Sequence, residues 1–269
     1  MKRYALILGS SSGFGRAAAL ELAKEGFGIY GVHLDRSATM PMVEELKAEL
    51  TNLGADPVFY NVNAADADRR AEIIHDINER SGGAASIGVL VHSLAFGSLQ
   101  PLVFIQEGDK PVTQKQLEMT LDVMANSLVY WTQDLVAKNL FCENSRIFGL
   151  TSAGSRRALP MYGAVSAAKA AMEAYCRQLA MELAPLKITA NAICAGVTDT
   201  PALKKIPGND IIIGNAMMRN PNHRLTTPDD VAKFIRLLSK PESLWVNGDV
   251  IRVDGGEDAI DLTWWKPNS

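Results

Sequence analysis

The sequence predicts an α/β protein built as one domain, with a doubly wound parallel sheet and helices on both of its faces. Two observations predict this fold class. Short apolar runs alternate with longer amphipathic segments, and a glycine-rich turn joins the first apolar run to the first amphipathic segment. No change in composition marks a linker and no repeat divides the chain, so residues 1–269 are expected to form a single domain.

The elements follow in order from the spacing of apolar residues. The run from Tyr4 to Leu8 predicts a buried strand, and the segment from Phe14 to Lys24 predicts the first helix. In the second helix, Val43, Leu46 and Leu50 recur at helical spacing. The other predicted strands are 29–34, 57–62, 87–92, 146–150, 188–193 and 250–253, and the other helices are 42–53, 66–80, 113–140, 162–183 and 228–238. Each crossover between parallel strands is expected to be right-handed.

Composition and spacing exclude several classes of protein. The chain has 27 Lys and Arg against 30 Asp and Glu, which argues against binding nucleic acid through phosphate contacts. The four histidines form no HxxxH or HExxH pattern and the three cysteines no CxxC pair, so no metal site or disulfide framework is expected. No stretch has the roughly 18 apolar residues of a membrane span, and the N-terminal apolar run is too short for a signal peptide. A cytoplasmic protein that binds no membrane is expected.

The turn after the first strand has the chemistry of a phosphate-binding loop. Gly9, Gly13 and Gly15 give the spacing GxxxGxG, in place of the GxGxxG common in dinucleotide-binding folds. Gly9 suits the tight turn, Gly13 leaves room for a pyrophosphate, and Gly15 lets the helix lie close to the sheet. The helix N-terminus offers free N–H groups to phosphates. A simple turn is the alternative, but the position between strand and helix favours dinucleotide binding.

The end of the second strand should distinguish NAD from NADP. An acidic residue there binds the ribose 2′-hydroxyl of NAD, whereas an arginine accommodates the 2′-phosphate of NADP. His33 stands where NAD-preferring proteins have their acid, and Arg36 is placed to hold a phosphate. Asp35, next to it, is suited either to bind a ribose or to repel a phosphate. We therefore expect NADPH as the cofactor, with NADH as the alternative.

Tyr162 and Lys169 lie seven residues apart on the predicted helix 162–183. Seven steps of about 100° return to within about 20° of the same face, and the rise separates the two residues by about 10 Å. Both can face one cleft, where an ammonium favours the ionised tyrosine and makes it a better donor to developing negative charge. An interfacial tyrosine and a solvated lysine are the ordinary alternative, and the glycine-rich turn favours the catalytic pair.

Three motifs together resemble the short-chain dehydrogenase/reductases. They are the turn at 9–15, the segment Asn191-Ala-Ile-Cys-Ala-Gly196 and the segment Val253-Asp-Gly-Gly256. The resemblance covers about residues 3 to 257, with the motifs in the expected order. It implies a Rossmann-like domain, a nicotinamide cofactor and a homotetramer or homodimer.

The departures from that family's common pattern are more specific. Ser166 stands where most members have the catalytic lysine, Met124 replaces a catalytic asparagine, and His92-Ser-Leu-Ala95 replaces Asn-Asn-Ala-Gly. All three changes resemble the enoyl-acyl-carrier-protein reductase branch, which has Tyr-x6-Lys. The GxxxGxG turn, with Ser152 in place of a second tyrosine ten residues before Tyr162, is similar to the type III enoyl reductases, which use NADPH.

The resemblance implies a function in fatty acid metabolism. We expect reduction of the 2,3 double bond of an enoyl thioester, carried by acyl carrier protein or coenzyme A, with a hydride from NADPH. A carbonyl reductase or alcohol dehydrogenase of the same family is the alternative, but Ser166 and Met124 replace two of its expected catalytic residues. A catalytically silent NADP-binding sensor is less favoured, because Tyr162 and Lys169 are both present.

The same resemblance implies roles for individual residues. Tyr162 is expected to stabilise the enolate oxygen and Lys169 to hold the nicotinamide ribose. Ser152 is expected either to be a second donor to that oxygen or to bind only water or backbone, and the adjacent Thr151 is the alternative for the donor position. Cofactor contacts are expected from Gly9, Ser12, Gly13, Phe14, Gly15, Arg36, Asn63, Ala64, Ser93, Ala95, Lys169, Thr198 and Thr200. Ordinary turn chemistry is the alternative for the loop residues among them.

Residues 201–224 are predicted to form a substrate lid before the last strand. Their apolar residues, which suit a bound acyl chain or an ordinary amphipathic helix, are Leu203, Ile206, Ile211, Ile212, Ile213, Met217 and Met218. Basic residues that either meet an acidic carrier or coenzyme A, or are solvated, are Arg156, Arg157, Lys204, Lys205, Arg219 and Arg224. In the C-terminal tail, 258–269, Trp264 and Trp265 are expected at a subunit interface.

Overall fold

The sheet and its two helical layers match the predicted fold class in a computed structural model that describes residues 2–206 and 208–260. Seven strands form one sheet in the order β3-β2-β1-β4-β5-β6-β7, and every neighbouring pair is parallel. The strands are β1 Tyr4–Leu8, β2 Gly28–His33, β3 Pro57–Asn61, β4 Ile87–His92, β5 Phe141–Ser152, β6 Thr189–Ala195 and β7 Val250–Val253. Trp264 and Trp265 lie outside the described residues.

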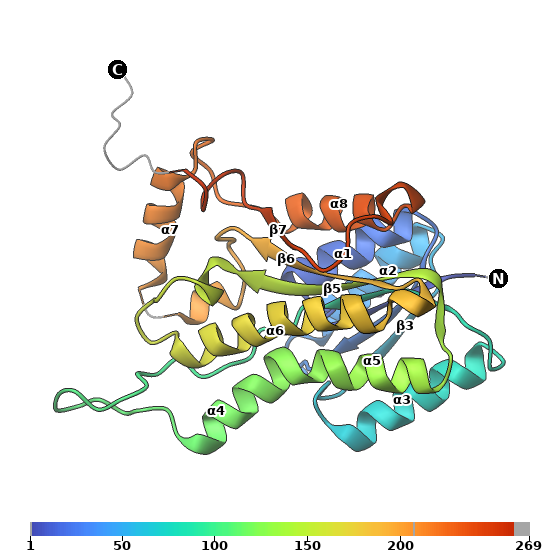
Figure 1. The fold of residues 1–269 in the computed structure, drawn as a ribbon, viewed down its shortest axis with the longest axis horizontal. Helices are drawn as coiled ribbons and strands as arrows, with labels where there is room; N and C mark the ends of the chain where they lie inside the picture. The colour runs from blue at the N-terminus through green and yellow to red at the C-terminus, as the bar shows by residue number, and fades with distance from the viewer. Residues whose placement is uncertain (1, 207, 261–269) are drawn as a thin grey trace.

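Helices cover both faces of the sheet, as Figure 1 shows. The helices are α1 Gly13–Lys24, α2 Met40–Asn52, α3 Ala67–Arg80, α4 Gln114–Leu121, α5 Ser127–Ala137, α6 Gly163–Glu182, α7 Asn209–Arg219 and α8 Pro228–Leu238. Buried side chains of α3, α5 and α6 share one hydrophobic cluster with the sheet, including Ile73, Trp131 and Met172. Those of α1, α2 and α8 share a second cluster on the other face. Strands β2, β4 and β6 are buried throughout, as parallel strands between two helical layers must be.

The order of the strands creates the site. The chain runs from β1 outward to β2 and β3, then returns past β1 to β4 and continues to β7. At the carboxyl ends of β1 and β4 the connections therefore lead away in opposite directions, which leaves a crevice where such folds bind ligands. Gly9 and Ser93 follow these two strands, and a Cβ atom on Gly9 would lie 2.6 Å from the carbonyl oxygen of Ser93. The two loops therefore meet at the floor of the crevice.

Two predicted elements differ from the structure. The helix expected over 113–140 is interrupted by a π-helical turn, Asp122–Asn126, between α4 and α5. Its apolar spacing resembles that of a continuous helix, so the sequence pattern did not reveal the extra residue per turn. Strand β5 begins at Phe141 instead of the predicted residue 146, because an irregular register opposite β4 and several polar residues hide its first half.

The connections that flank the crevice are long. Residues 93–113 lead from β4 to α4, and Figure 1 shows part of this segment extending away from the body of the molecule beyond α4. Leu102, on this segment, lies so close to the start of α6 that a Cβ atom on Gly163 would be 2.7 Å from its Cγ. The predicted lid contains α7, which Figure 1 shows on the same side of the molecule as α4. Within the described residues, no helix is long and apolar enough to span a membrane.

Candidate active site

A cavity of about 320 Å³ lies at the carboxyl ends of β4, β5 and β6, between these strand ends and the lid. It brings together eight of the residues that the sequence analysis singled out: Phe14, Ser93, Ala95, Ser152, Tyr162, Lys169, Thr198 and Thr200. Apolar side chains complete much of its wall, including Leu99, Met124 and Val165. Met124 is 3% exposed and occupies the position where an asparagine was expected for carbonyl reductases.

The glycine-rich turn fits a pyrophosphate beside the cavity. Gly9 and Gly13 have φ values of +87° and +52°, which residues with a side chain rarely adopt. A Cβ atom on Gly15 would lie 2.0 Å from the carbonyl oxygen of Gly9, so only glycine allows α1 to approach this closely. Ser12 precedes α1 and makes no side-chain hydrogen bond to its first turn. The N–H groups there are available to an anion, as a dinucleotide phosphate requires.

Thr200, the residue just before the predicted lid, lies against this turn. Its Cγ2 is the nearest atom, at 3.5 Å, to a Cβ built on Gly13. Its Oγ1 accepts a hydrogen bond from the Leu203 N–H, at 3.2 Å. Thr198 is buried and donates from Oγ1 to the carbonyl oxygen of Gly196, at 3.0 Å. Both threonines thus lie where the glycine-rich turn and the cavity meet.

Tyr162 is the residue immediately before α6, and Ser152, the last residue of β5, lies next to it. Burial raises the pKa of the Tyr162 phenol, and the nearby Ser152 hydroxyl opposes that rise. The expectation that Lys169 would favour the ionised tyrosine is therefore wrong, because burial dominates. The phenol keeps its proton at neutral pH and is a hydrogen-bond donor.

Thr151 and Ser152, the alternatives for the second donor, both line the cavity but differ in their hydrogen bonds. Thr151 donates from Oγ1 to Oε1 of Glu173 at 2.8 Å. The buried Ser152 Oγ makes no hydrogen bond of standard geometry among the described residues. It is nevertheless close enough to Tyr162 to affect its pKa. Ser152 is thus the hydroxyl that remains available to a ligand.

Lys169 is buried in the cavity wall. Its Nζ donates a 2.6 Å hydrogen bond to the carbonyl oxygen of Leu150. Burial lowers the pKa of Lys169 to about 8. Nearby His92 is also buried, and its Nε2 lies 2.8 Å from Oγ of Ser127. Burial and the positive charge of Lys169 lower the pKa of His92 to about 3, so His92 is neutral at physiological pH.

The residues at the end of β2 lie close to the glycine-rich turn. Nδ1 of His33 is 2.9 Å from Oδ2 of Asp35. Burial favours the protonated form of Asp35, but hydrogen bonds with Ser11, Thr39 and His33 together hold its pKa below the ordinary value. Arg36 is exposed and forms no ion pair within the described part of the chain. A negative and a positive group therefore both stand where a ribose 2′-substituent was expected.

Asn63 and Ala64 do not line the cavity. Asn63 is exposed after β3, and its Oδ1 accepts a hydrogen bond from the Ala65 N–H at 3.1 Å. The carbonyl oxygen of Ala64 accepts a hydrogen bond from Nε1 of Trp131 at 2.8 Å. Both residues lie at the same edge of the sheet as the glycine-rich turn, where the adenine half of a dinucleotide would extend.

The lid contributes only part of its apolar surface to the cavity. Leu203, Ile206 and Ile212 line the cavity. Ile211 and Met218 are instead 65% and 67% exposed. The predicted lid therefore lines the cavity with one part of its apolar side chains and exposes another part.

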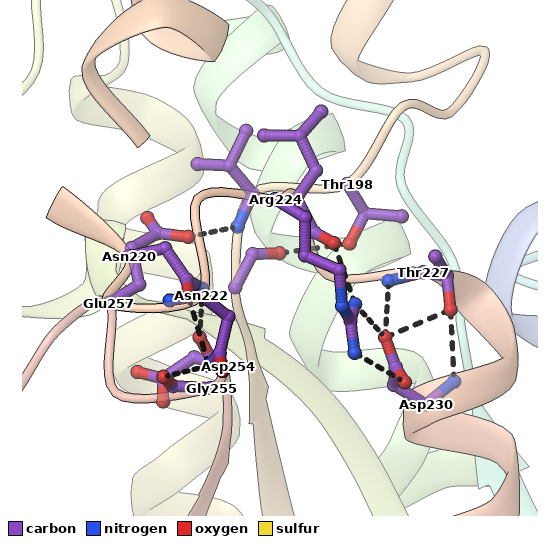
Figure 2. Close-up of polar contacts among 12 residues, drawn as sticks. Thr198, Asn220, Asn222, Arg224, Thr227, Asp230, Asp254, Gly255 and Glu257 are labelled. Atoms are coloured by element: carbon purple, nitrogen blue, oxygen red, sulfur yellow. Dashed lines mark hydrogen bonds and ion pairs between the residues drawn. The ribbon is translucent and has the colours of Figure 1, made fainter. Parts of the chain in front are cut away.

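Figure 2 shows how the C-terminal end of the lid is held. Arg224 makes two hydrogen bonds to the carboxylate of Asp230, at 2.7 and 3.1 Å, in the first turn of α8. Asn220 donates from Nδ2 to the carbonyl oxygen of Asp254, at 2.9 Å, just after β7. These contacts attach the lid to the two elements that follow it.

The basic residues near the lid are paired within the chain. Lys204 pairs with Asp199, Arg219 with Glu257, Arg224 with Asp230, and Arg156 and Arg157 both pair with Asp258. The Lys205 side chain lies outside the described part of the structure. A ligand phosphate would therefore compete with carboxylates for the five paired residues.

A glycine-rich turn at the switch point of a parallel sheet, beside a half-buried tyrosine and a buried lysine, defines an oxidoreductase that uses a nicotinamide dinucleotide. Comparison with known proteins agrees with this class. Residues 9–257 match the family model described as enoyl-(acyl carrier protein) reductase, and the chain belongs to this family of short-chain dehydrogenase/reductases. Members of the short-chain dehydrogenase/reductases bind NAD(H) or NADP(H).

Individual relatives include enzymes of different specificity. A 3-oxoacyl-[acyl-carrier-protein] reductase of Thermotoga maritima is 29% identical over 251 residues, covering 93% of this chain and 96% of the relative. An L-2,3-butanediol dehydrogenase of Corynebacterium glutamicum is 28% identical over 274 residues, covering 95% and 98%. The crystal structure of an NADH enoyl-[acyl-carrier-protein] reductase of Aquifex aeolicus superposes with a TM-score of 0.80 at 24% identity, covering 96% and 97%. The last comparison supports the fold.

Proposed function

We propose that the protein reduces the 2,3 double bond of an enoyl thioester with NADPH. The observation that carries this proposal is the Tyr162–Lys169 spacing, which places both side chains in one cavity with the apolar Met124. A carbonyl reductase places its tyrosine one helical turn nearer to the lysine. The longer spacing suits an oxygen that lies further from the carbon receiving the hydride.

The residues of the cavity have distinct parts in this reaction. A bound NADPH would supply the hydride for the β-carbon of the substrate, and negative charge would then develop on the thioester oxygen. Tyr162 donates a hydrogen bond to that oxygen and stabilises its developing negative charge, with Ser152 as a second donor. Lys169 holds the nicotinamide ribose and contributes a positive charge nearby. The α-carbon then takes a proton from solvent, which completes the saturated thioester.

NADPH is the proposed cofactor because Arg36 is exposed and unpaired with any acid in the described structure. A guanidinium group at this position suits the 2′-phosphate. Asp35 disfavours binding of a 2′-phosphate, because its lowered pKa keeps a negative charge beside the glycine-rich turn. The alternative is thus NADH, whose adenosine ribose hydroxyls would donate hydrogen bonds to Asp35.

The carrier and the assembly are further parts of the proposal. The substrate is an enoyl group on acyl carrier protein or coenzyme A, and the apolar residues Leu203, Ile206 and Ile212 cover its acyl chain. We also propose a homotetramer or homodimer in the cytoplasm, with no nucleic acid or membrane partner. The pairing of the basic residues with carboxylates favours neither carrier.

A carbonyl reductase or alcohol dehydrogenase is the second candidate. The relatives from Thermotoga maritima and Corynebacterium glutamicum favour it, because their names describe a 3-oxoacyl reductase and a butanediol dehydrogenase. The replacement of the expected lysine by Ser166 and of the expected asparagine by Met124 speaks against it.

One set of assays separates the two candidates. Oxidation of NADPH and of NADH is followed with crotonyl-CoA, with a longer enoyl thioester, and with acetoin as the ketone. The proposal predicts turnover of the enoyl thioesters alone. Turnover of the ketone without turnover of either enoyl thioester would replace the proposal by the second candidate.

A further inference from the structure

Consecutive residues at the end of β5 bind two residues of α6. The carbonyl oxygen of Leu150 accepts the hydrogen bond from Nζ of Lys169, at 2.6 Å. The side chain of Thr151 donates to Oε1 of Glu173, at 2.8 Å. Glu173 follows Lys169 by four residues, which places it one turn further along the same face of α6. The end of β5 thus binds two successive turns of α6, one through Lys169 and the next through Glu173.

Glu173 is a buried acidic residue of α6. The residue is 7% exposed, on a helix whose other face carries solvated positions such as Glu182. Burying a carboxyl group costs free energy unless hydrogen bonds or an opposite charge compensate. Thr151 supplies a hydrogen bond, and Lys169 supplies the opposite charge. Buried charged groups can often be replaced by apolar residues without loss of stability, so stability alone does not account for a carboxyl group here.

Glu173 is the acidic residue one turn after Lys169 on α6, and other titratable groups near Lys169 come from β4, β6 and the start of α6. From β4, His92 is neutral, since its pKa is lowered to about 3. From β6, Cys194 is an uncharged thiol, because burial raises its pKa to about 11. Burial likewise raises the pKa of Tyr162, which stays protonated. Burial lowers the pKa of Lys169 most strongly, whereas Cys194 first and then Glu173 act to raise it.

We infer that Glu173 is a positioning residue for the cofactor: it keeps Lys169 protonated in the buried site and fixes its helix against β5 through Thr151. The inference rests on the proposed use of Lys169 to hold the nicotinamide ribose. It applies equally to enoyl and carbonyl reduction. Its test therefore uses cofactor binding and leaves the identity of the substrate aside.

The experiment compares Glu173→Gln with Glu182→Gln, a matched change on the exposed end of the same helix. The dissociation constant of NADPH is measured by nucleotide fluorescence from about pH 6 to about pH 10. In the wild-type protein and in Glu182→Gln, affinity should fall as Lys169 loses its proton near pH 8. In Glu173→Gln, the midpoint of that fall should move to lower pH by about one unit, the scale of a neighbouring charge.

Two further variants separate charge from shape. Thr151→Val removes the hydrogen bond but keeps the carboxyl group, so it should move the midpoint less than Glu173→Gln does. Glu173→Asp keeps a negative charge and should bring the midpoint back toward that of the wild type. Circular dichroism and thermal unfolding confirm that each variant is folded.

The outcomes that overturn the inference are specific. An unchanged midpoint in Glu173→Gln shows that the carboxyl group does not act on Lys169. If Glu173→Gln weakens NADPH binding by the same factor at every pH, Glu173 has only a structural role. Failure of the enoyl thioester assays, with the midpoint shift present, overturns the proposed substrate and leaves this inference standing.

Discussion

The ammonium group of Lys169 donates its hydrogen bond to the carbonyl oxygen of Leu150, 2.6 Å away at the end of β5. This contact holds a cation at the floor of a largely apolar cavity, and burial lowers its pKa to about 8. The positive charge that a cofactor meets there therefore depends on pH within the physiological range.

Replacing Lys169 by Met tests the use of this charge. A hydrogen bond to a charged group contributes about 1.5 to 3 kcal/mol, so the dissociation constant of NADPH should rise roughly tenfold or more. Because the titrating group is gone, the fall in affinity above about pH 8 should also disappear. Fluorescence titrations at several pH values measure both effects. Persistence of the wild-type pH dependence would assign it to a group other than Lys169.

Tyr162→Phe tests the proposed donor to the thioester oxygen. Loss of one such donor lowers kcat by roughly 100-fold, while cofactor affinity should change little. Tyr175→Phe is the matched control, because Tyr175 lies on the same helix and donates to Oδ1 of Asn126, at 2.9 Å, outside the cavity wall. Steady-state kinetics with crotonyl-CoA measure kcat for both variants. Equal activities of the two variants would remove Tyr162 from the mechanism.

The end of β2 should set the preference between the two nucleotides. Arg36→Ala should raise the dissociation constant of NADPH much more than that of NADH, because it removes the proposed phosphate partner. Asp35→Asn should act in the opposite sense and favour NADPH, since it removes a negative charge near the same position. Competition titrations with both nucleotides measure the ratio. Equal effects of Arg36→Ala on both nucleotides would contradict the proposed preference.

Gly15→Ala tests the close approach of α1 to the turn. Its Cβ would lie 2.0 Å from the Gly9 carbonyl oxygen, so the helix must shift. We expect a loss of about 1 to 3 kcal/mol in the free energy of unfolding and a loss of NADPH binding. Gly214→Ala, in α7, is the control, because a Cβ there meets no atom within 4 Å. Denaturant unfolding and nucleotide titration give both quantities; a Gly15→Ala protein that binds NADPH normally would argue against the proposed pyrophosphate contact.

The sequence was sufficient for the architecture because the strands between two helical layers are continuous apolar runs. Turn chemistry located the glycine loop, and the spacing of Tyr162 and Lys169 placed both in one cavity. The π-helical turn at Asp122–Asn126 was missed, since one extra residue per turn leaves the apolar pattern almost unchanged.

Long-range contacts were beyond the reach of sequence patterns. Nothing local shows that Thr151 binds Glu173, twenty-two residues away, although a glutamate one turn after the lysine was a usable signal. The pKa of Tyr162 was expected to fall but rises, because burial depends on neighbours from several elements. Likewise, the acidic partners of Arg156, Arg157 and Arg219 lie after β7, far along the chain.

The most direct test of the proposed reaction is the position at which the hydride arrives. Crotonyl-CoA is reduced with NADPH that carries deuterium on the transferred position of its nicotinamide, and the product is analysed by NMR. The proposal predicts butanoyl-CoA with deuterium at C3 alone, since Tyr162 stabilises charge on the thioester oxygen while C3 receives the hydride. Unchanged crotonyl-CoA, alongside a ketone reduced to an alcohol with deuterium on its carbinol carbon, would contradict the proposal.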